Sequence, residues 1–312
     1  MNYYVKSNSN TKAVYCTDDG TVIIQDLVKN STLFEINIFG EKYKYLEREW
    51  NIFPYFSFSP DEKWLIASYG IGYIYFIELE SGKICKHIRL FEDVDYNIKS
   101  FEEIDTCCYY NEYTRIDFSS SGQYIVARVR GDFDPQESDG RQNMFEPIYF
   151  RSVFIFDMQT LKMIFKYNYP EGEKYGPMSL ATIAFSPDEK LFVTGVLGGQ
   201  IKIFDLLTGK EIAQQDNLEW IADSTGIDHR NLISFVNNRE LVYVNIKKEL
   251  VYLAIEQTEN LREICKYFRD ELIANKIIYD IEFDAINNAV NCYGENKTDL
   301  ICSYIIKVNS II

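Results

Sequence analysis

Hydrophobic and polar residues alternate along most of the chain in short runs that end in turn-forming residues. Residues 57–83, SFSPDEKWLIASYGIGYIYFIELESGK, return as a near copy at 184–210, AFSPDEKLFVTGVLGGQIKIFDLLTGK. In each copy an apolar run ends in Phe-Ser, and Ser-Pro-Asp-Glu then supplies the residues of a type I turn. Two more apolar runs follow, and Ser-Gly-Lys or Thr-Gly-Lys begins a hairpin into a fourth. Each copy therefore predicts four short antiparallel strands.

Weaker copies of this unit fill the rest of the chain, at 3–36, 115–167 (with an insertion), 226–255 and 279–306. The count is six four-stranded units, or seven if one divergent copy has been overlooked. Small sheets with apolar residues on both faces cannot stand alone, and radial stacking lets each sheet cover its neighbours. The sequence thus predicts an all-β protein, a β-propeller that spans 1–312 as a single domain.

The second clear copy resembles the WD40 repeat. Phe204-Asp205 stands where that family usually has Trp-Asp, and Phe156-Asp157 and Gln25-Asp26 are weaker versions of the same position. None of the units has the family's Gly-His dipeptide, so the buried Asp–His–Ser/Thr–Trp hydrogen-bond chain of the family cannot form. The resemblance implies a divergent, WD40-like propeller and, by analogy of fold, an interaction scaffold.

One segment departs from the strand pattern. Within 257–277 the apolar residues Leu261, Ile264, Cys265, Phe268 and Leu272 follow helical spacing, and Asn260 with Glu263 fits a capping box. These positions predict a short amphipathic helix at 260–274. Its apolar side would pack on the propeller rim, or alternatively dock a partner.

The turns within units are tight, whereas long segments connect the units. The long segments are 39–54, 91–112, 131–149, 167–178, 215–228 and 257–277. We assign 131–149 to the connection between the second and third strands of its unit, and the others to connections between units. In a propeller both kinds of connection leave the sheets at the same end. Long insertions on one side of a repeat protein often form its binding face.

Charge is concentrated in the same segments. The chain has 47 acidic and 32 basic residues, a net charge of -15. Segments 91–112, 131–149, 215–228 and 167–178 have net charges of -6, -4, -4 and -1, which together equal that of the whole chain. This distribution argues against nucleic acid or an anionic membrane as a direct partner and favours a protein with a basic surface.

Aromatic residues lie among these acids, and Tyr and Trp side chains offer large contact areas with a polar group. The predicted partner-binding residues are Glu92, Asp93, Asp95, Tyr96, Glu102, Glu103, Asp105, Tyr109, Tyr110, Asp132, Asp134, Glu137, Asp139, Trp220, Asp223 and Trp50. The alternative interpretation is that the acids keep a large propeller soluble and the aromatic residues hold the loops in place.

No pattern of catalytic or metal-binding residues is evident. The two histidines, His87 and His229, fall in different units, and residues 131–140 lack the Gly and Glu that an EF-hand calcium loop requires. The seven cysteines form no CxxC pair, which favours reduced thiols in a cytoplasmic protein. We therefore expect no enzyme activity, no cofactor and no metal.

The leading functional hypothesis is a non-catalytic scaffold, adaptor or complex subunit that presents an acidic, aromatic loop face to a basic protein partner. Two alternatives stay open. One is a propeller enzyme, a hydrolase or lyase, that uses carboxylates at the central channel. The other is an inhibitory module against a basic toxin or nuclease.

Overall fold

The computed structural model describes residues 4–38, 54–69, 73–90, 108–110, 113–135, 148–169, 182–196, 200–216, 233–244, 250–255, 261–267, 280–284, 286–287, 289–293 and 300–305. Every regular element in these ranges is a β-strand, so the predicted all-β class is confirmed. The chain divides into two compact units, Met1–Glu171 and Gly172–Ile312. Because the sheets of a repeat fold contact mainly their neighbours, such a division does not test the predicted single domain.

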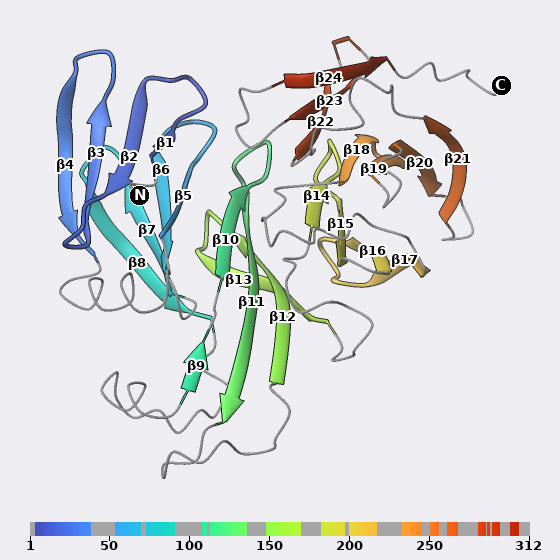
Figure 1. Cartoon of the computed structure of the whole chain (residues 1–312), viewed down its shortest axis with the longest axis horizontal. Coiled ribbons are helices and arrows are strands. Elements are labelled where there is room, and N and C mark those ends of the chain that lie inside the picture. Colours follow the sequence, from blue (N-terminus) through green and yellow to red (C-terminus); the bar gives the residue numbers. More distant parts are fainter. Residues whose placement is uncertain are drawn as a thin grey trace. The chain divides into compact units, whose positions relative to one another are not determined.

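The first unit contains three antiparallel sheets, each with its strands in chain order (Figure 1). The first sheet consists of β1 (Val5–Lys6), β2 (Lys12–Cys16), β3 (Thr21–Asp26) and β4 (Ser31–Asn37). The second consists of β5 (Tyr55–Phe58), β6 (Trp64–Tyr69), β7 (Tyr73–Glu78) and β8 (Lys83–Arg89). The third consists of β10 (Tyr113–Phe118), β11 (Tyr124–Pro135), β12 (Ile148–Asp157) and β13 (Lys162–Asn168), and β9 (Cys108–Tyr110) also pairs with β11.

The second unit repeats this architecture. One sheet consists of β14 (Thr182–Phe185), β15 (Leu191–Val196), β16 (Gln200–Asp205) and β17 (Glu211–Asp216). The next consists of β18 (Ile233–Asn237), β19 (Glu240–Val244), β20 (Leu250–Ile255) and β21 (Leu261–Tyr267). The last described sheet contains β22 (Asp280–Asp284), β23 (Ala289–Tyr293) and β24 (Leu300–Ile305). Residues 306–312 lie outside the described residues, and the number of blades stays a prediction.

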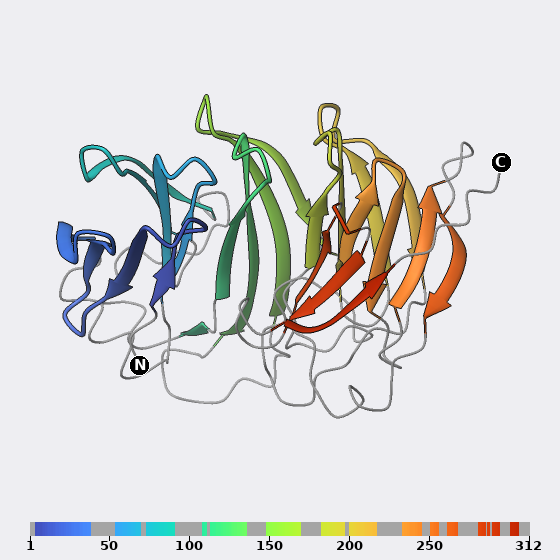
Figure 2. The same ribbon diagram turned by 90° about the horizontal axis from the view of Figure 1, so that it is seen from above.

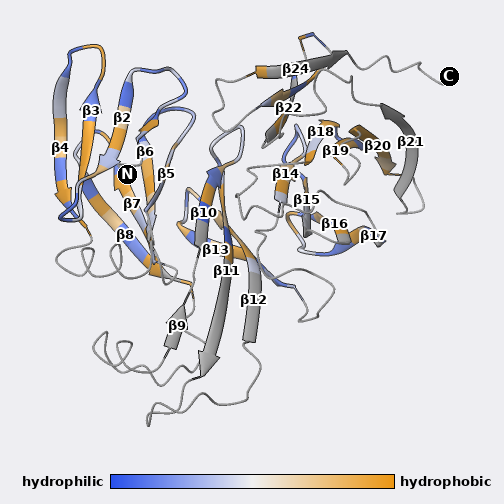
Figure 3. Cartoon of the chain, in the orientation of Figure 1, coloured by the Kyte–Doolittle hydropathy of each residue, from blue (hydrophilic) through white to orange (hydrophobic). Residues whose placement is uncertain are grey.

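Each sheet is apolar on both faces, as the sequence pattern requires. In the first unit, apolar stretches run along β2, β3, β6 and β7, and the turns between strands are hydrophilic (Figure 3). The core clusters cross from sheet to sheet: Val14 and Ile24 of the first sheet pack with Leu65 and Ile77 of the second. Burial of both faces between neighbouring sheets is therefore the main stabilising interaction.

A buried serine organises the first turn of four sheets. Ser7, Ser59, Ser119 and Ser186 are at most 3% exposed. In each turn the serine Oγ accepts a hydrogen bond from the backbone N–H five residues later, at 2.9–3.1 Å. The fourth turn residue has a positive φ and is Asn10, Glu62, Gly122 or Glu189. The predicted Ser-Pro-Asp-Glu turns are confirmed, since Glu62 N donates to Ser59 O at 2.9 Å and Glu189 N donates to Ser186 O at 2.8 Å.

In four sheets the third strand ends in an acidic residue, which is followed by the last hairpin turn and a bulge. These residues are Asp26, Glu78, Asp157 and Asp205. The Asp205 carboxylate accepts hydrogen bonds from Thr208 N at 2.8 Å and Thr208 Oγ1 at 2.7 Å, and Asp157 makes the same pair with Thr160. These bonds, above all the one from the Thr208 hydroxyl, lower the pKa of the Asp205 carboxyl. After the turn, the pairing register shifts by one residue in the outer strand of all six described sheets.

The predicted helix at 260–274 is wrong for the part of it that the structure describes. Residues Leu261–Tyr267 form β21, which pairs with β20, and Ile264 is the extra residue of the bulge. A bulge interrupts strict alternation. Because β21 contains this bulge, its apolar residues do not alternate strictly, and those at 261, 264 and 265 also fit the spacing of a helix. Phe268 and Leu272 lie outside the described residues.

Candidate functional site

The middle strands of the third sheet are longer than the outer strands. β11 and β12 pair from Tyr124↔Asp157 to Phe133↔Ile148. In contrast, β10 pairs with β11 only as far as Arg130, and β13 pairs with β12 only as far as Ser152. The two strands therefore continue as a hairpin beyond the sheet (Figure 1; Figure 2 shows the same strands from above). At its end, β9 pairs with Phe133, Asp134 and Pro135 of β11. We call residues 108–110, 131–135 and 148–151 the hairpin extension.

Pairing register assigns the residues of this extension to two faces, because residues directly opposite each other in an antiparallel pair share a face. Asp132 is opposite Tyr149, and Asp134 is opposite Tyr109. One face thus combines two aspartates and two tyrosines. Three of these, Tyr109, Asp132 and Asp134, are predicted partner-binding residues.

The other face of the extension has apolar residues. Phe133 is opposite both Tyr110 and Ile148, Gly131 is opposite Phe150, and Pro135 is opposite Cys108. This face continues the row of Ile125, Ala127 and Val129, which are buried against the second sheet. Tyr110 is therefore placed with the apolar residues and apart from Tyr109.

The predicted loop 131–149 is shorter than expected, because β11 continues to Pro135 and β12 begins at Ile148. Pairing with β12 extends the strand through Gly131 and Asp132, where sequence patterns indicate a loop, and β9 pairs with the three residues that follow. The remaining predicted partner-binding residues lie outside the described residues. They are Glu92, Asp93, Asp95, Tyr96, Glu102, Glu103, Asp105, Glu137, Asp139, Trp220, Asp223 and Trp50.

A buried ion cluster that the sequence analysis missed lies on the same face of the third sheet as the two aspartates. Arg128 is fully buried and its Nη2 donates to Asp117, and the Arg115 Nε lies 3.9 Å from the same carboxylate. A buried charge needs such a partner to avoid a large desolvation cost. The signal was available in the sequence, since Arg128 occupies an interior strand position between Ala127 and Val129.

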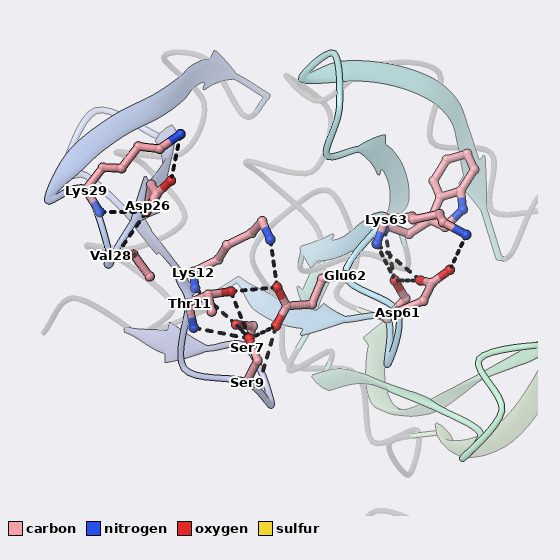
Figure 4. Close-up of polar contacts among 12 residues, drawn as sticks. Ser7, Ser9, Thr11, Lys12, Asp26, Val28, Lys29, Asp61, Glu62 and Lys63 are labelled. Carbon is pink, nitrogen blue, oxygen red and sulfur yellow. Dashed lines mark hydrogen bonds and ion pairs between the residues drawn. The ribbon is translucent and has the colours of Figure 1, made fainter.

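A second polar cluster joins the first two sheets of this unit (Figure 4). The Glu62 carboxylate accepts hydrogen bonds from Lys12 Nζ at 2.6 Å, from Thr11 Oγ1 at 2.7 Å and from the Ser9 hydroxyl. Burial raises the pKa of the Glu62 carboxyl, but these donors outweigh it and lower the pKa from 4.5 to about 2. Glu62 therefore connects two turns 50 residues apart in sequence.

One repeat of the chain matches the model of a known family. Residues 173–205, which include β14, β15 and β16, match the model of the WD domain, G-beta repeat. The fold is that of a WD40-like β-propeller. In its matched repeat, Phe204 takes the place of the family's Trp. Its ring is buried and stacks on Phe192 with centroids 5.1 Å apart.

Solved structures are similar to this chain at low sequence identity. The chain is similar to the β-propeller domain of Cps50 (Swd1) from Myceliophteria thermophila, with 13% identity, 94% of this chain and 79% of that chain covered, and a TM-score of 0.49. It is also similar to a chain of the mitotic checkpoint complex, with 11% identity, 94% and 74% covered, and a TM-score of 0.50. No curated protein matches the sequence.

The WD40-like propeller has a further acidic region that was not predicted. A shallow depression of about 410 Å³ on the first sheet is lined by Thr17, Asp18, Asp19, Thr21, Ile23 and Glu35. Asp19 accepts hydrogen bonds from Thr17 Oγ1 and from Thr21 N, so its carboxylate is used to form the turn. Among the described residues, no group of three or more His, Cys, Asp or Glu has a geometry that could hold a metal ion. Nor do they include a helix long and apolar enough to cross a membrane.

Proposed function

We propose that this WD40-like propeller is a non-catalytic interaction module that binds a protein partner with a basic surface, and that the hairpin extension forms part of the contact. The observation that supports this proposal is the register that puts Tyr109, Asp132, Asp134 and Tyr149 on one face. Tyrosine next to carboxylate suits a partner rich in Lys and Arg, since the carboxylates attract the cations and the rings supply contact area.

Strand pairing makes the hairpin extension suitable for binding a partner. Binding costs less when the contacting residues are ordered beforehand. The extension is paired across three strands and continues directly from a packed sheet. A partner would thus meet a backbone that is already ordered by strand pairing.

The described carboxyl groups with a resolved pKa shift are poorly suited to act as general acids. Where a shift is resolved among the described carboxyl groups, the pKa is lowered, as for Asp61, Glu62, Asp188 and Asp205. A general acid near neutral pH needs a raised pKa. These carboxylates instead accept hydrogen bonds within turns or between sheets.

The proposal is tested by reversing the charge of Asp132 and Asp134. We expect the Asp132→Lys/Asp134→Lys protein to capture its native partner from cell extract at least about tenfold less than wild type, since attraction becomes repulsion. Capture is quantified by mass spectrometry at low and high salt, and the loss should be larger at low salt.

The matched control is Asp18→Lys/Glu35→Lys, which makes the same change of charge on the first sheet. Both variants must unfold at temperatures close to that of the wild type. Retention of every partner by the Asp132→Lys/Asp134→Lys protein would refute the proposal, and so would equal loss in both variants.

A further inference from the structure

The outermost strands of the second and third sheets are basic, in contrast to the chain as a whole. β8 contains Lys83, Lys86 and Arg89, and β13 contains Lys162 and Lys166; neither strand has a carboxylate. Of the other described outer strands, β4, β17 and β21 each include at least one carboxylate, and β24 has no charged residue. A net charge of -15 makes this local excess of cations unexpected.

The two basic strands lie next to each other in the first unit. Lys86 Nζ of β8 donates to Leu161 O, in the turn immediately before β13. Ile88 of β8 and Leu161 also pack against the same core cluster. We call Lys83, Lys86, Lys162, Met163, Ile164 and Lys166 the basic rim.

Apolar side chains are exposed at the basic rim. Met163 and Ile164 are 49% and 44% exposed, and they are the only adjacent pair among the large hydrophobic residues exposed in the described part of the chain. Lys162 and Lys166, on either side of them, are also exposed. The surface thus combines cations with an apolar centre.

Protection of the sheet edge explains the lysines but not the apolar pair. Lysines and bulges on an outer strand prevent unwanted pairing with another chain, and β13 has both. Exposed Met and Ile have the opposite effect, because they attract apolar surface. The Glu78 and Asp157 carboxylates stand opposite Lys83 and Lys162 in the strand pairing and offset part of the charge of the rim. Lys166 instead stands opposite the uncharged Phe154, with its Nζ 5.6 Å from the centroid of that ring.

We propose that the basic rim is a second docking surface, for an extended acidic segment of a partner protein that also carries large apolar side chains. Its carboxylates would pair with Lys83, Lys162 and Lys166, and an apolar side chain would cover Met163 and Ile164. The bulge at Ile164 disfavours strand addition, so recognition is through side chains. An anionic membrane fits less well, because a flat surface would face the negative charge of the whole molecule, whereas a flexible segment reaches the rim alone.

Fluorescence anisotropy with a labelled, Glu-rich peptide that contains several Leu and Phe residues tests this proposal on the full chain. We expect binding to weaken by about tenfold in Lys162→Glu/Lys166→Glu and by several-fold in Met163→Ser/Ile164→Ser. A Lys-rich counterpart of the peptide should bind the Lys162→Glu/Lys166→Glu protein better than it binds wild type.

Lys210→Glu is a single-charge control. Lys210, just before β17, corresponds to Lys162 at the start of β13, and β17 has two carboxylates. This control should leave the affinity for the peptide unchanged. The proposal is wrong if the acidic peptide does not bind, if Lys210→Glu weakens binding as much as Lys162→Glu/Lys166→Glu, or if vesicles of phosphatidylserine and phosphatidylcholine bind the rim in preference to the peptide. Because these variants leave Asp132 and Asp134 intact, the result is independent of the proposed basic partner.

Discussion

Individual polar residues hold the turns of this protein in place. Ser7, Ser59, Ser119 and Ser186 are buried, and each accepts a hydrogen bond from the backbone at the start of the following strand. A buried N–H without an acceptor is costly. The serine hydroxyl is thus a structural requirement of the turn, which explains why the same residue type recurs where the neighbouring residues differ.

Replacement of one of these serines should destabilise the protein measurably. Ser119→Ala removes the acceptor for Tyr124 N, 3.1 Å away, and we expect the free energy of unfolding to fall by about 1–2 kcal/mol. Urea denaturation gives this value. Ser121→Ala is the control, because this exposed serine of the same turn accepts a bond from Gln123 N in contact with water. Its effect should stay below about 0.5 kcal/mol, and equal effects would contradict this role of the buried hydroxyl.

The hydrogen bonds to Glu62 predict a dependence of stability on pH. Because the pKa of its carboxyl is lowered from 4.5 to about 2 in the folded protein, the stabilisation is present above pH 4.5 and is lost as the pH falls towards 2. Allowing for solvent screening, we expect Glu62→Gln to lower the free energy of unfolding by about 1–2 kcal/mol at neutral pH.

Urea denaturation from neutral pH to pH 3 should show the difference between Glu62→Gln and wild type shrinking. Glu35→Gln, at an exposed position on the first sheet, serves as the control and should change stability little. A difference that stays constant over this range would show that Glu62 does not act through its charge.

At the scale of the strand, pattern reasoning succeeds where side chains alternate and fails where a bulge shifts them. The strands of the two clear copies, 57–83 and 184–210, and their Ser-Pro-Asp-Glu turns were predicted because period two and turn chemistry are local properties. β21 was misread because Ile264 interrupts alternation. Tyr109, Asp132 and Asp134 were selected by residue type, but the pairing of β9 with β11 that brings them together depends on register, which the sequence does not specify.

Neighbouring strands also constrain each other through single glycines. Gly82, at the end of the turn before β8, has a φ of +68°, and a Cβ built on it would lie 2.3 Å from Phe34 Cδ1 of β4. We therefore expect Gly82→Ala to lower the free energy of unfolding by about 2 kcal/mol or more, through backbone strain and overpacking.

A double-mutant cycle separates these two causes. In a Phe34→Ala background the clash is removed, so Gly82→Ala should cost only the backbone term, about 1 kcal/mol. Urea denaturation of the four proteins gives the coupling between the two positions. A cost of Gly82→Ala that is the same in both backgrounds would contradict contact between the two sheets at this point.

At the scale of the whole molecule, acidic and basic residues are concentrated in different regions. The acidic residues are concentrated in segments between or beyond the sheets, and two outer strands are basic. We propose a basic partner for the hairpin extension and an acidic segment of a partner for the basic rim. Because the two surfaces are separate, this protein can bind both partners at the same time. The sequence alone indicates the acidic segments. The basic rim depends on the contact between β8 and the turn before β13, which the sequence does not specify.

The uniform turns with a buried serine have a consequence for how such a chain can change over evolution. Adding or deleting a residue between the serine and the next strand would misplace the backbone N–H that donates to the serine Oγ, so length changes there should be selected against. The segments that connect one sheet to the next carry no such constraint. Homologous chains should therefore differ in the lengths of those connections, acquiring new recognition sequences there while the sheets stay unaltered.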